Sequence, residues 1–192
     1  MVKLLWAKQG DPPHSLLAHA LDTAAVAQAV LRREPPSTLR LYVADWDLSE
    51  KEAEAWVSFL AGLHDLGKAS PVFQSHWPER AELLREKGLA WEEGLKDDQV
   101  PHGVFTELFL KKLLEERGVA ERVANDVAAA LGAHHGFPAS AEEKRAARRH
   151  LKLEDRLWLE ARRWLLDKLF QSLQAPVPSL KEVRPEAVLR VM

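Results

Sequence analysis

The stretch Leu63-His64-Asp65-Leu66-Gly67-Lys68 places an imidazole and a carboxylate at adjacent positions of the backbone. Adjacent residues on a helix point about 100° apart, so His64 and Asp65 cannot hold one ion from a single helix face. They suit a bridge instead, in which Asp65 gives one carboxylate oxygen to each of two ions. The stretch therefore predicts that several helices converge on a metal site with Asp65 at its centre.

Four further histidines suit the same site. His19 lies beside the apolar face of the first predicted helix, His102 follows a proline, and His134 and His135 form a doublet at a helix end. One such histidine alone is more often a core residue with a satisfied hydrogen bond. Together, in a chain without cysteine, they indicate nitrogen and oxygen ligands for metal, provided that the helices converge on one pocket. The histidines that lack this context are predicted to be surface or capping residues: His14, His76 and His150.

A second carboxylate is needed, because histidines with one aspartate leave two divalent cations with little anionic charge around them. Asp167 is the predicted ligand, since an aspartate among large apolar neighbours in mid-helix is poorly solvated and a poor helix former. Asp126 and Asp155 are competitors, and an ordinary ion pair with a nearby basic residue is the alternative. Asp22, three residues after His19, is either its orienting partner or a solvated acid.

Helix signals dominate the chain, and the sequence contains neither alternating strands nor a glycine-rich phosphate loop. Ser49-Glu50-Lys51-Glu52 and Ser140-Ala141-Glu142-Glu143 are capping-box patterns, each of which predicts a helix start. The predicted helices span residues 15–33, one from 49 that carries His64 and Asp65 near its end and is broken by Gly67, a short one from 70, 79–87, 104–117, 119–133, one from 140, and 154–173, with a loop over 88–101. We therefore expect an all-α fold, a compact helical bundle with the metal site between its helices.

The composition fits one domain, because 192 residues of which 46% are hydrophobic can bury one sizeable core. The absence of cysteine excludes zinc ribbons and disulfide frameworks, and a net charge of -2 argues against a generally basic nucleic-acid coat. The N-terminus is not a signal peptide and no apolar run reaches membrane-spanning length, so we expect a cytoplasmic protein with no membrane partner. Since Pro176, Pro178 and Pro185 break the helical pattern, we expect a domain over residues 1–174 and a proline-rich tail or linker over 175–192.

The residues His19, His64-Asp65 and a C-terminal aspartate resemble the pattern of the HD superfamily of metal-dependent phosphohydrolases, which are all-helical. His102 after proline and the His134-His135-Gly136 run look like the HD nuclease domain of the CRISPR-associated helicase-nuclease of type I interference systems. The match runs roughly from His14 to Ser172, with one departure: Ser172 lies a residue further from Asp167 than the family leads us to expect.

The resemblance implies an HD-type fold and a metal-dependent nuclease that hydrolyses phosphodiester bonds of single-stranded DNA in CRISPR interference. It implies two divalent transition-metal ions, with manganese, nickel or cobalt preferred, and the catalytic residues Asp65 and Lys68, the lysine on the phosphate side. The first ion would be held by His19, His64, Asp65 and Asp167, and the second by Asp65, His102, His134 and His135. The implied partners are a helicase domain, in the same or a separate chain, and a CRISPR surveillance complex.

A cationic run that follows the histidine doublet is the predicted path for DNA. Its members are Lys144, Arg145, Arg148 and Arg149. The alternative is an exposed helix face paired with neighbouring acids such as Glu142, Glu143 and Glu154. Most of the seven tryptophans fall at apolar helix positions and are expected in the core, which leaves Trp77 and Trp91 as candidates for base stacking.

Two other functions remain open at the level of sequence. The first is an HD phosphohydrolase that acts on a nucleotide or cyclic dinucleotide rather than a polymer, because the core chemistry would be the same. The second is a degenerate helical adaptor module that keeps the histidines as structural relics. Metal content separates the adaptor from either enzyme.

Overall fold

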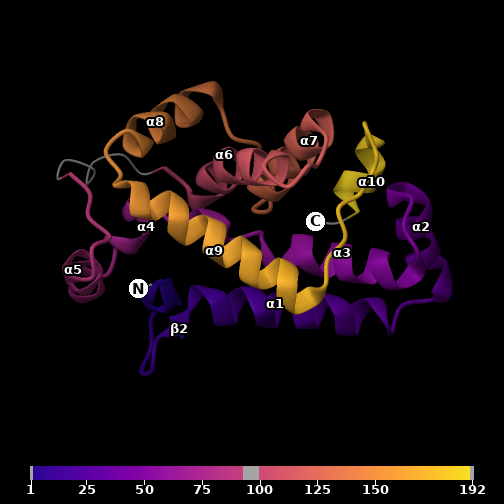
Figure 1. The fold of residues 1–192 in the computed structure, drawn as a ribbon, viewed down its shortest axis with the longest axis horizontal. Coiled ribbons are helices and arrows are strands. Elements are labelled where there is room, and N and C mark those ends of the chain that lie inside the picture. The colour runs from indigo at the N-terminus through magenta and orange to yellow at the C-terminus, as the bar shows by residue number, and fades with distance from the viewer. Residues whose placement is uncertain (1, 93–99, 191–192) are drawn as a thin grey trace.

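The computed structural model describes residues 2–92 and 100–190, and over these residues the fold is helical, as predicted. Its helices are η1 (Val2–Leu4), α1 (Leu16–Leu31), α2 (Pro36–Trp46), α3 (Glu50–Gly62), η2 (Leu66–Lys68), α4 (Pro71–Gln74), α5 (Pro78–Glu86), α6 (His102–Glu115), α7 (Glu121–Gly132), α8 (Ala141–Leu151), α9 (Arg156–Leu173) and α10 (Pro185–Leu189), drawn in Figure 1. A small antiparallel pair, β1 (Trp6–Lys8) and β2 (His14–Ser15), precedes α1.

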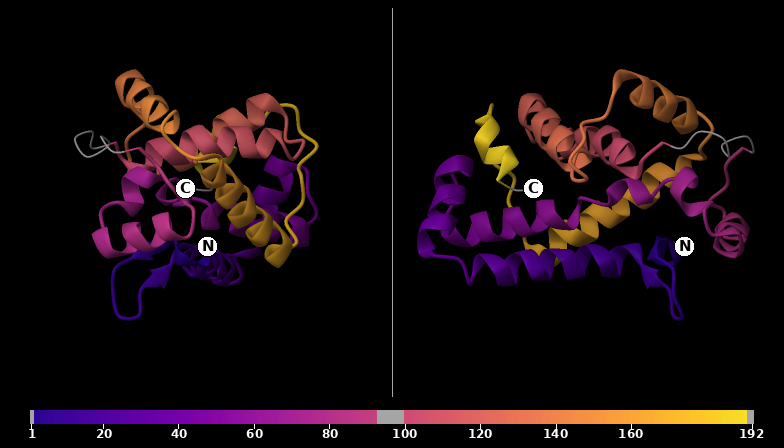
Figure 2. Two further views of the ribbon diagram at one scale, coloured as in Figure 1. Left: turned by 60° about the vertical axis from the view of Figure 1, so that its left-hand side comes forward. Right: turned by 180° about the vertical axis from the view of Figure 1, so that it is seen from behind.

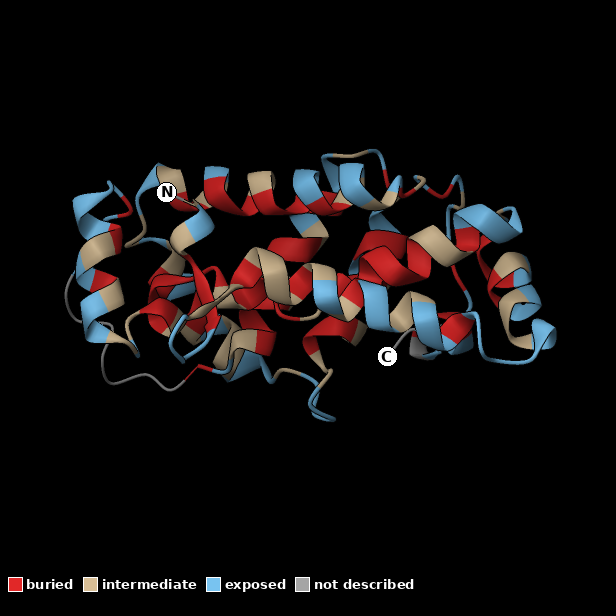
Figure 3. Ribbon diagram, turned by 90° about the horizontal axis from the view of Figure 1, so that it is seen from below, coloured by how far each residue is buried: buried red, intermediate tan, exposed pale blue. Residues whose placement is uncertain are grey.

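The helices form two packed groups that meet along α9. Helices α1 and α3 run side by side, α6 packs against α7, and α9 contacts α1, α3 and α6 between them (Figures 1 and 2). Buried positions lie on the faces that the helices turn toward one another, as Figure 3 shows. Fully buried Trp56, Phe59, Leu110 and Leu166 belong to this continuous core, which supplies the main stabilisation of such a bundle.

Both predicted capping boxes are present. Ser49 and Glu52 satisfy each other's backbone N–H groups at the start of α3, and Ser140 and Glu143 do the same at the start of α8. Helix α3 ends at Gly62, so the residues that follow it leave the helical path and form the short turn η2. Because α3 ends here, the stretch from Leu63 to Lys68 runs toward the interior of the molecule.

Two glycines permit the close approach of α6 to its neighbours. A Cβ at Gly67 would lie 1.8 Å from the carbonyl oxygen of His102, and one at Gly103 would lie 2.3 Å from that of Gly132. Neither distance is tolerable, so only glycine lets the start of α6 rest on η2 and on the end of α7. Three chain segments that carry histidines are thereby brought to one place.

Residues 175–190 do not form the loose tail that the prolines led us to expect. Val183, Ala187 and Val188 are buried, and α10 packs against α2 and α7. The Tyr42 hydroxyl donates a hydrogen bond to the Arg190 carbonyl oxygen at 2.6 Å. Pro176 and Pro178 follow the end of α9 and Pro185 begins α10, and the prolines do not prevent apolar side chains between and after them from joining the core. This segment therefore packs with the helices that precede it.

The guanidinium of Arg190 fixes the same segment through a buried carboxylate. Its Nε atom donates to Asp45 Oδ2 at 2.8 Å, and the Asp45 side chain is 2% exposed. Asp45 lies in α2, a helix that is not among the predicted elements, since two consecutive prolines such as Pro35-Pro36 are typical of a helix stop. In the structure Pro36 instead occupies the first turn of α2, where its missing N–H costs nothing.

The loop predicted over residues 88–101 lies partly outside the described residues, which omit 93–99 and with them Gly94, Asp97 and Asp98. Among the described residues, no helix combines the length and the apolar character that crossing a membrane requires.

Candidate metal centre

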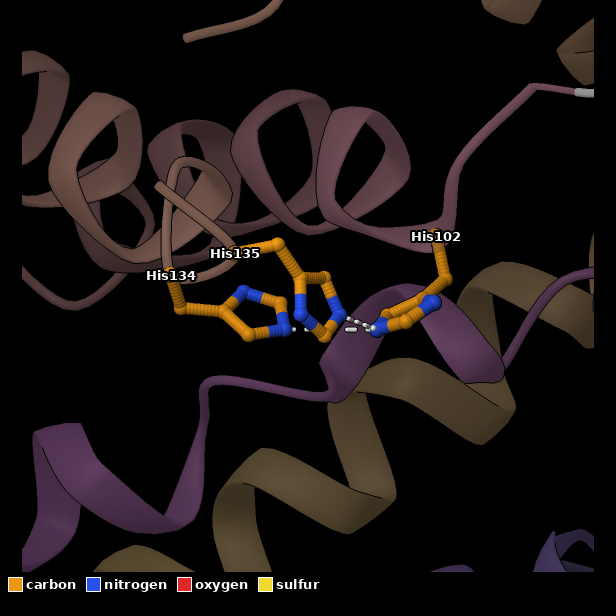
Figure 4. A group of neighbouring side chains, drawn as sticks. All are labelled: His102, His134 and His135. Atoms are coloured by element: carbon orange, nitrogen blue, oxygen red, sulfur yellow. Dashed lines mark hydrogen bonds between the residues drawn. The ribbon is translucent and has the colours of Figure 1, made fainter. Parts of the chain in front are cut away.

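Helix ends and turns, rather than helix faces, supply most of the predicted ligands. Asp65 lies in the turn between α3 and η2, His102 is the first residue of α6, and His134 and His135 follow the end of α7. His19 comes from the first turns of α1. Figure 4 shows the side chains of His134 and His135 pointing toward His102 across the gap between α7 and α6.

Asp65 lies between two groups of side chains and turns one carboxylate oxygen to each. Its Oδ2 atom is 2.9 Å from His19 Nε2 and 3.2 Å from His64 Nε2. Its Oδ1 atom is 2.9 Å from His102 Nε2 and 3.5 Å from His134 Nε2. The carboxylate therefore has the placement that a bridging ligand requires.

Each group can hold a metal ion by the spacing of its donor atoms. The donor atoms of His19, His64 and Asp65 lie within 4.8 Å of one another, as do those of His102, His134 and His135. In the second group His135 Nε2 is 3.2 Å from His102 Nε2. Such convergence of nitrogen atoms would be repulsive in the protonated state, so it favours neutral imidazoles that share a cation.

Backbone hydrogen bonds fix the ring orientation of two of these histidines. His64 Nδ1 donates to the carbonyl oxygen of Ala61 at 2.9 Å, and His134 Nδ1 donates to that of Leu131 at 2.7 Å. Both acceptors are carbonyls at the ends of helices, which lack partners within the helix. With Nδ1 held in this way, Nε2 of each ring faces Asp65. It donates to the carboxylate while it carries a proton, and it can bind a metal once that proton is lost.

The charge state of Asp65 is set by its neighbours. Burial of its side chain, which is 6% exposed, would raise its pKa, but hydrogen bonds with His102, His134, His19 and His64 outweigh this and hold the pKa well below its ordinary range. Lys68 adds an ion pair, with its Nζ 2.7 Å from Asp65 Oδ2. For His135, burial and the nearby His134 and His102 lower the pKa. Near neutral pH, Asp65 is thus an anion, and His135 is a neutral imidazole that can bind a metal.

Two buried polar residues that sequence reasoning missed hold this turn in place. Thr106 Oγ1 donates to the His64 carbonyl oxygen at 3.0 Å and accepts the Gly67 N–H at 2.9 Å. Gln74 Nε2 donates at 2.9 Å to the carbonyl oxygen of Lys68 and, at the same distance, to that of Trp6. Neither has a sequence signal, because a threonine or glutamine within a helix is ordinarily a surface residue.

A buried ion pair supports the other side of η2. Arg162 donates from Nη1 to the Ala69 carbonyl oxygen at 3.1 Å and from Nη2 to Glu154 Oε2 at 2.6 Å. Burial raises the pKa of Glu154, although the charge of Arg162 opposes this shift. The pair connects α9 to the residue that follows Lys68.

Asp167 is not brought to either group of ligands. Its side chain is 51% exposed and forms an ion pair with Arg117, because α9 turns Leu165, Leu166 and Leu169 toward the core instead. The ordinary ion pair that sequence reasoning kept as the alternative is the arrangement found. Among the described residues, the two groups of possible ligands also leave out Asp126 and Asp155.

Other predicted residues lie outside the ligand groups. Asp22 is 70% exposed and pairs with His14, whose Nε2 is 3.0 Å from Asp22 Oδ2, rather than with His19. His76 is exposed as expected, whereas His150 is buried on α8. Trp77 and Trp91 are partly buried and pack against Trp6 and Trp158, so they are not free for base stacking.

The predicted cationic run lies on α8, and its members differ. Lys144 pairs with Glu107 at 2.6 Å, while Arg145, Arg148 and Arg149 are exposed. Ser140 caps the start of α8, a few residues after the histidine doublet. The first of the exposed arginines lies within about two helical turns of Ser140. This arrangement leaves positive charge on the surface close to the candidate centre.

The donor set fits transition-metal ions. Five imidazoles and one carboxylate form a nitrogen-rich site, whereas magnesium and calcium prefer oxygen ligands. The buried, hydrogen-bonded anion at the middle of the site has the charge that bound cations need. Asp65, His19, His64, His102, His134 and His135 are the residues that could hold them.

Comparison with known proteins relates this chain to a single family. The family model described as Cas3, HD domain, matches residues 6–191. The CRISPR-associated endonuclease/helicase Cas3 of Thermus thermophilus is 64% identical over 191 residues, which are 98% of this chain and 20% of that protein. The chain thus spans about one fifth of the length of this curated relative.

Solved structures give the same result. A crystal structure of the Thermus thermophilus Cas3 HD domain in the presence of Ni2+ has a TM-score of 0.80 at 58% identity, covering 100% of this chain and 73% of that one. A structure described as a CRISPR RNA-guided surveillance complex, pre-nicking, contains a chain with a TM-score of 0.74 at 25% identity, covering 92% of this chain and 22% of that one.

Proposed function

This chain belongs to the Cas3 HD domain family, and we propose that it is a metal-dependent nuclease domain that hydrolyses phosphodiester bonds of single-stranded DNA. The observation that carries this proposal is the placement of Asp65, whose two oxygens face two separate groups of histidines. The family places the chain with the CRISPR-associated nuclease-helicases, and the choice of substrate is our inference.

We propose that His19, His64 and Asp65 hold one divalent ion, and that Asp65, His102, His134 and His135 hold another. When bound, two such ions activate water for in-line attack on phosphorus and stabilise charge on the attacking and leaving oxygens. The protein's own task is to orient the ligands and to keep Asp65 ionised. Lys68, which is 12% exposed and beside Asp65, supplies a positive charge for a phosphate oxygen.

The nitrogen-rich donor set supports manganese, nickel or cobalt as the working ions, and the related Thermus structure was determined in the presence of Ni2+. We also propose that the reaction takes place in the cytoplasm. There the domain would act beside a helicase domain and at a CRISPR surveillance complex, as the names of the similar proteins suggest.

The proposal is tested with the Asp65→Asn variant of this chain. This change keeps the shape of the side chain but removes the anion that both groups share, so we expect loss of cleavage of single-stranded DNA by at least a hundredfold. Elemental analysis should show metal content falling from about two ions per chain, the number in a bridged site. Asp47→Asn is the matched control, because Asp47 is an exposed C-cap residue at φ 50, a conformation that asparagine also adopts.

Cleavage that survives in the Asp65→Asn variant at wild-type rate would refute the bridging role. A panel of single-stranded DNA, single-stranded RNA, mononucleotides and cyclic dinucleotides with Mn2+ separates the nuclease from a phosphohydrolase of small nucleotides. A wild-type chain that binds no Mn2+, Ni2+ or Co2+ at all would indicate a degenerate adaptor instead.

A further inference from the structure

One aromatic side chain near the candidate centre is largely exposed. Phe137 lies two residues after His135 and is 82% exposed, the largest value among the large hydrophobic residues in the part of the chain that the structure describes. The others, Val26, Val30, Leu41 and Val177, are aliphatic and lie 41 to 62% exposed. Isolated exposed aliphatic residues are normal on protein surfaces. A largely exposed phenyl ring beside a candidate metal site indicates a surface that binds a ligand.

The turn that carries Phe137 is built to leave the ring in solvent. Gly136 has φ +90, a conformation that other residues rarely adopt, and a Cβ added there would meet nothing within 4 Å. Gly136 thus directs the chain so that the Phe137 side chain, two residues after His135, is largely exposed to solvent.

A hollow connects this ring to the second group of histidines. Its volume is about 260 Å³, and its walls include His135, Phe137, Pro101, Pro138 and Glu143. This is smaller than the pockets of about 300–1,000 Å³ that take drug-sized ligands, so it suits a single ring system. Because His135 is one of its walls, the hollow adjoins one of the proposed ligands.

The chemistry of the walls favours a nucleobase over a phosphate. A phenyl ring and two prolines offer flat apolar surfaces, and Glu143 offers a carboxylate that would repel an anion. Glu143 is held at the rim by the backbone N–H of Ser140, at 2.7 Å. A carboxylate accepts hydrogen bonds from the amino groups that bases carry on their edges. Arg145 and Arg148 are exposed on α8, the helix whose first turn carries Glu143, and offer positive charge for the phosphates that flank such a base.

We propose that Phe137 is a stacking platform for one unpaired base of the DNA strand, next to the phosphate that is cleaved. The proposal rests on the function proposed above and adds a contact that fixes the register of the strand. Stacking reads the face that all bases share, so Phe137 contributes affinity and positioning without strong preference among bases.

The test uses Phe137→Ala in the complete chain. Loss of one base stack should lower kcat/KM on single-stranded DNA by roughly 5- to 150-fold, while metal content stays unchanged. Phe137→Trp should retain the wild-type value, since a larger ring stacks at least as well. Val26→Ala, at a residue of α1 that is 62% exposed, is the matched control for removal of an exposed apolar side chain.

A second measurement separates stacking from a structural effect. End-labelled oligonucleotides with a single abasic site give a ladder of products for each position of the missing base. The wild-type chain should cut poorly at one fixed offset from the abasic site, and Phe137→Ala should show no such gap, because the contact is already lost.

Three outcomes would overturn the proposal. If Phe137→Ala cleaves single-stranded DNA at the wild-type rate, Phe137 does not contact the base. If the gap in the product ladder persists in this variant, other residues bind the base. A loss of activity that is equal on every abasic substrate means that the ring acts elsewhere, as in contact with another protein domain. If the wild-type chain with bound metal does not cleave single-stranded DNA, the function proposed above fails first.

Discussion

At the scale of single residues, Asp65 combines burial with an unusually dense set of donors. Four imidazoles and one ammonium group surround a carboxylate that is almost inaccessible to solvent. Such an anion is stable only when every oxygen is paired, and here each oxygen serves a different group of histidines. The residues that fix the peptide groups around Asp65 therefore control how well it can bridge two cations.

Thr106 is the first residue where this can be measured. Thr106→Val keeps the shape of the side chain but leaves the buried Gly67 N–H and the His64 carbonyl without a partner. We expect a loss of about 1–3 kcal/mol in the free energy of unfolding and weaker metal binding, measured by urea titration and calorimetry with Mn2+. Ser58→Ala is the control, because Ser58 is equally buried but bonds only within α3, to Glu54. An unchanged metal affinity in Thr106→Val would show that the turn does not need this support.

For Asp167, the expectation and the structure differ. The sequence predicts a metal ligand, and the structure shows an ion pair with Arg117. Because its side chain is half exposed and paired with Arg117, Asp167→Asn should cost no more than about 1 kcal/mol of stability and leave metal content and cleavage near wild type. Elemental analysis and a nuclease assay of the variant decide the matter. If the variant loses an ion, Asp167 is a ligand after all, through a rearrangement of α9.

At the scale of elements, the centre depends on the contact between η2 and the start of α6. The turn and the helix pack so closely that the backbone of Gly67 and the carbonyl oxygen of His102 leave no room for a side chain. Contacts between backbones are rigid, since neither partner can move to another rotamer. The position of His102 relative to Asp65 is thereby set by backbone packing.

Gly67→Ala tests this contact. The added methyl group would lie 1.8 Å from the His102 carbonyl oxygen, so the two elements must separate and carry His102 away from Asp65. We expect destabilisation of about 1–3 kcal/mol or more and a larger proportional loss of metal affinity than of helical circular dichroism. Gly10→Ala is the control, because a methyl group there meets only the Pro12 carbonyl oxygen at 3.4 Å. Wild-type metal binding by Gly67→Ala would mean that the contact is not required.

At the scale of the whole molecule, the C-terminal segment closes the fold. It runs back over the molecule so that α10 lies against both α2 and α7, and its arginines pair with buried Asp45 (Figure 1). Helices that are distant along the sequence are thus held together by a segment without a long helix of its own. The stability of the domain should depend on it.

Deletion of residues 175–192 tests this dependence. Removing two buried valines alone should cost about 3 kcal/mol of unfolding free energy, and Asp45 would lose its partners. Urea denaturation of the shortened chain, compared with the full chain, measures the effect. If residues 175–192 are a loose linker, their deletion leaves the urea midpoint of unfolding unchanged, and that result would support the domain boundary expected after residue 174.

Features that depend on nearby residues could be predicted from the sequence. The capping boxes of Ser49 and Ser140 follow from patterns a few residues long, whereas α3 ends at Gly62, before the stop expected at Gly67. The short runs around His64-Asp65, Pro101-His102 and His134-His135 identified side chains that the fold does gather, because their positions at helix ends are local properties.

Which distant groups meet depends on the packing of the whole fold. Whether Asp167 faces a metal or Arg117 depends on the rotation of α9 against the core, and the roles of Thr106 and Gln74 depend on which backbone lies opposite them. The burial of residues near the C-terminus likewise depends on surfaces that α2 and α7 create together. Short patterns set where a helix begins and ends. How the helices pack depends on contacts throughout the core, and no single segment of the sequence encodes those contacts.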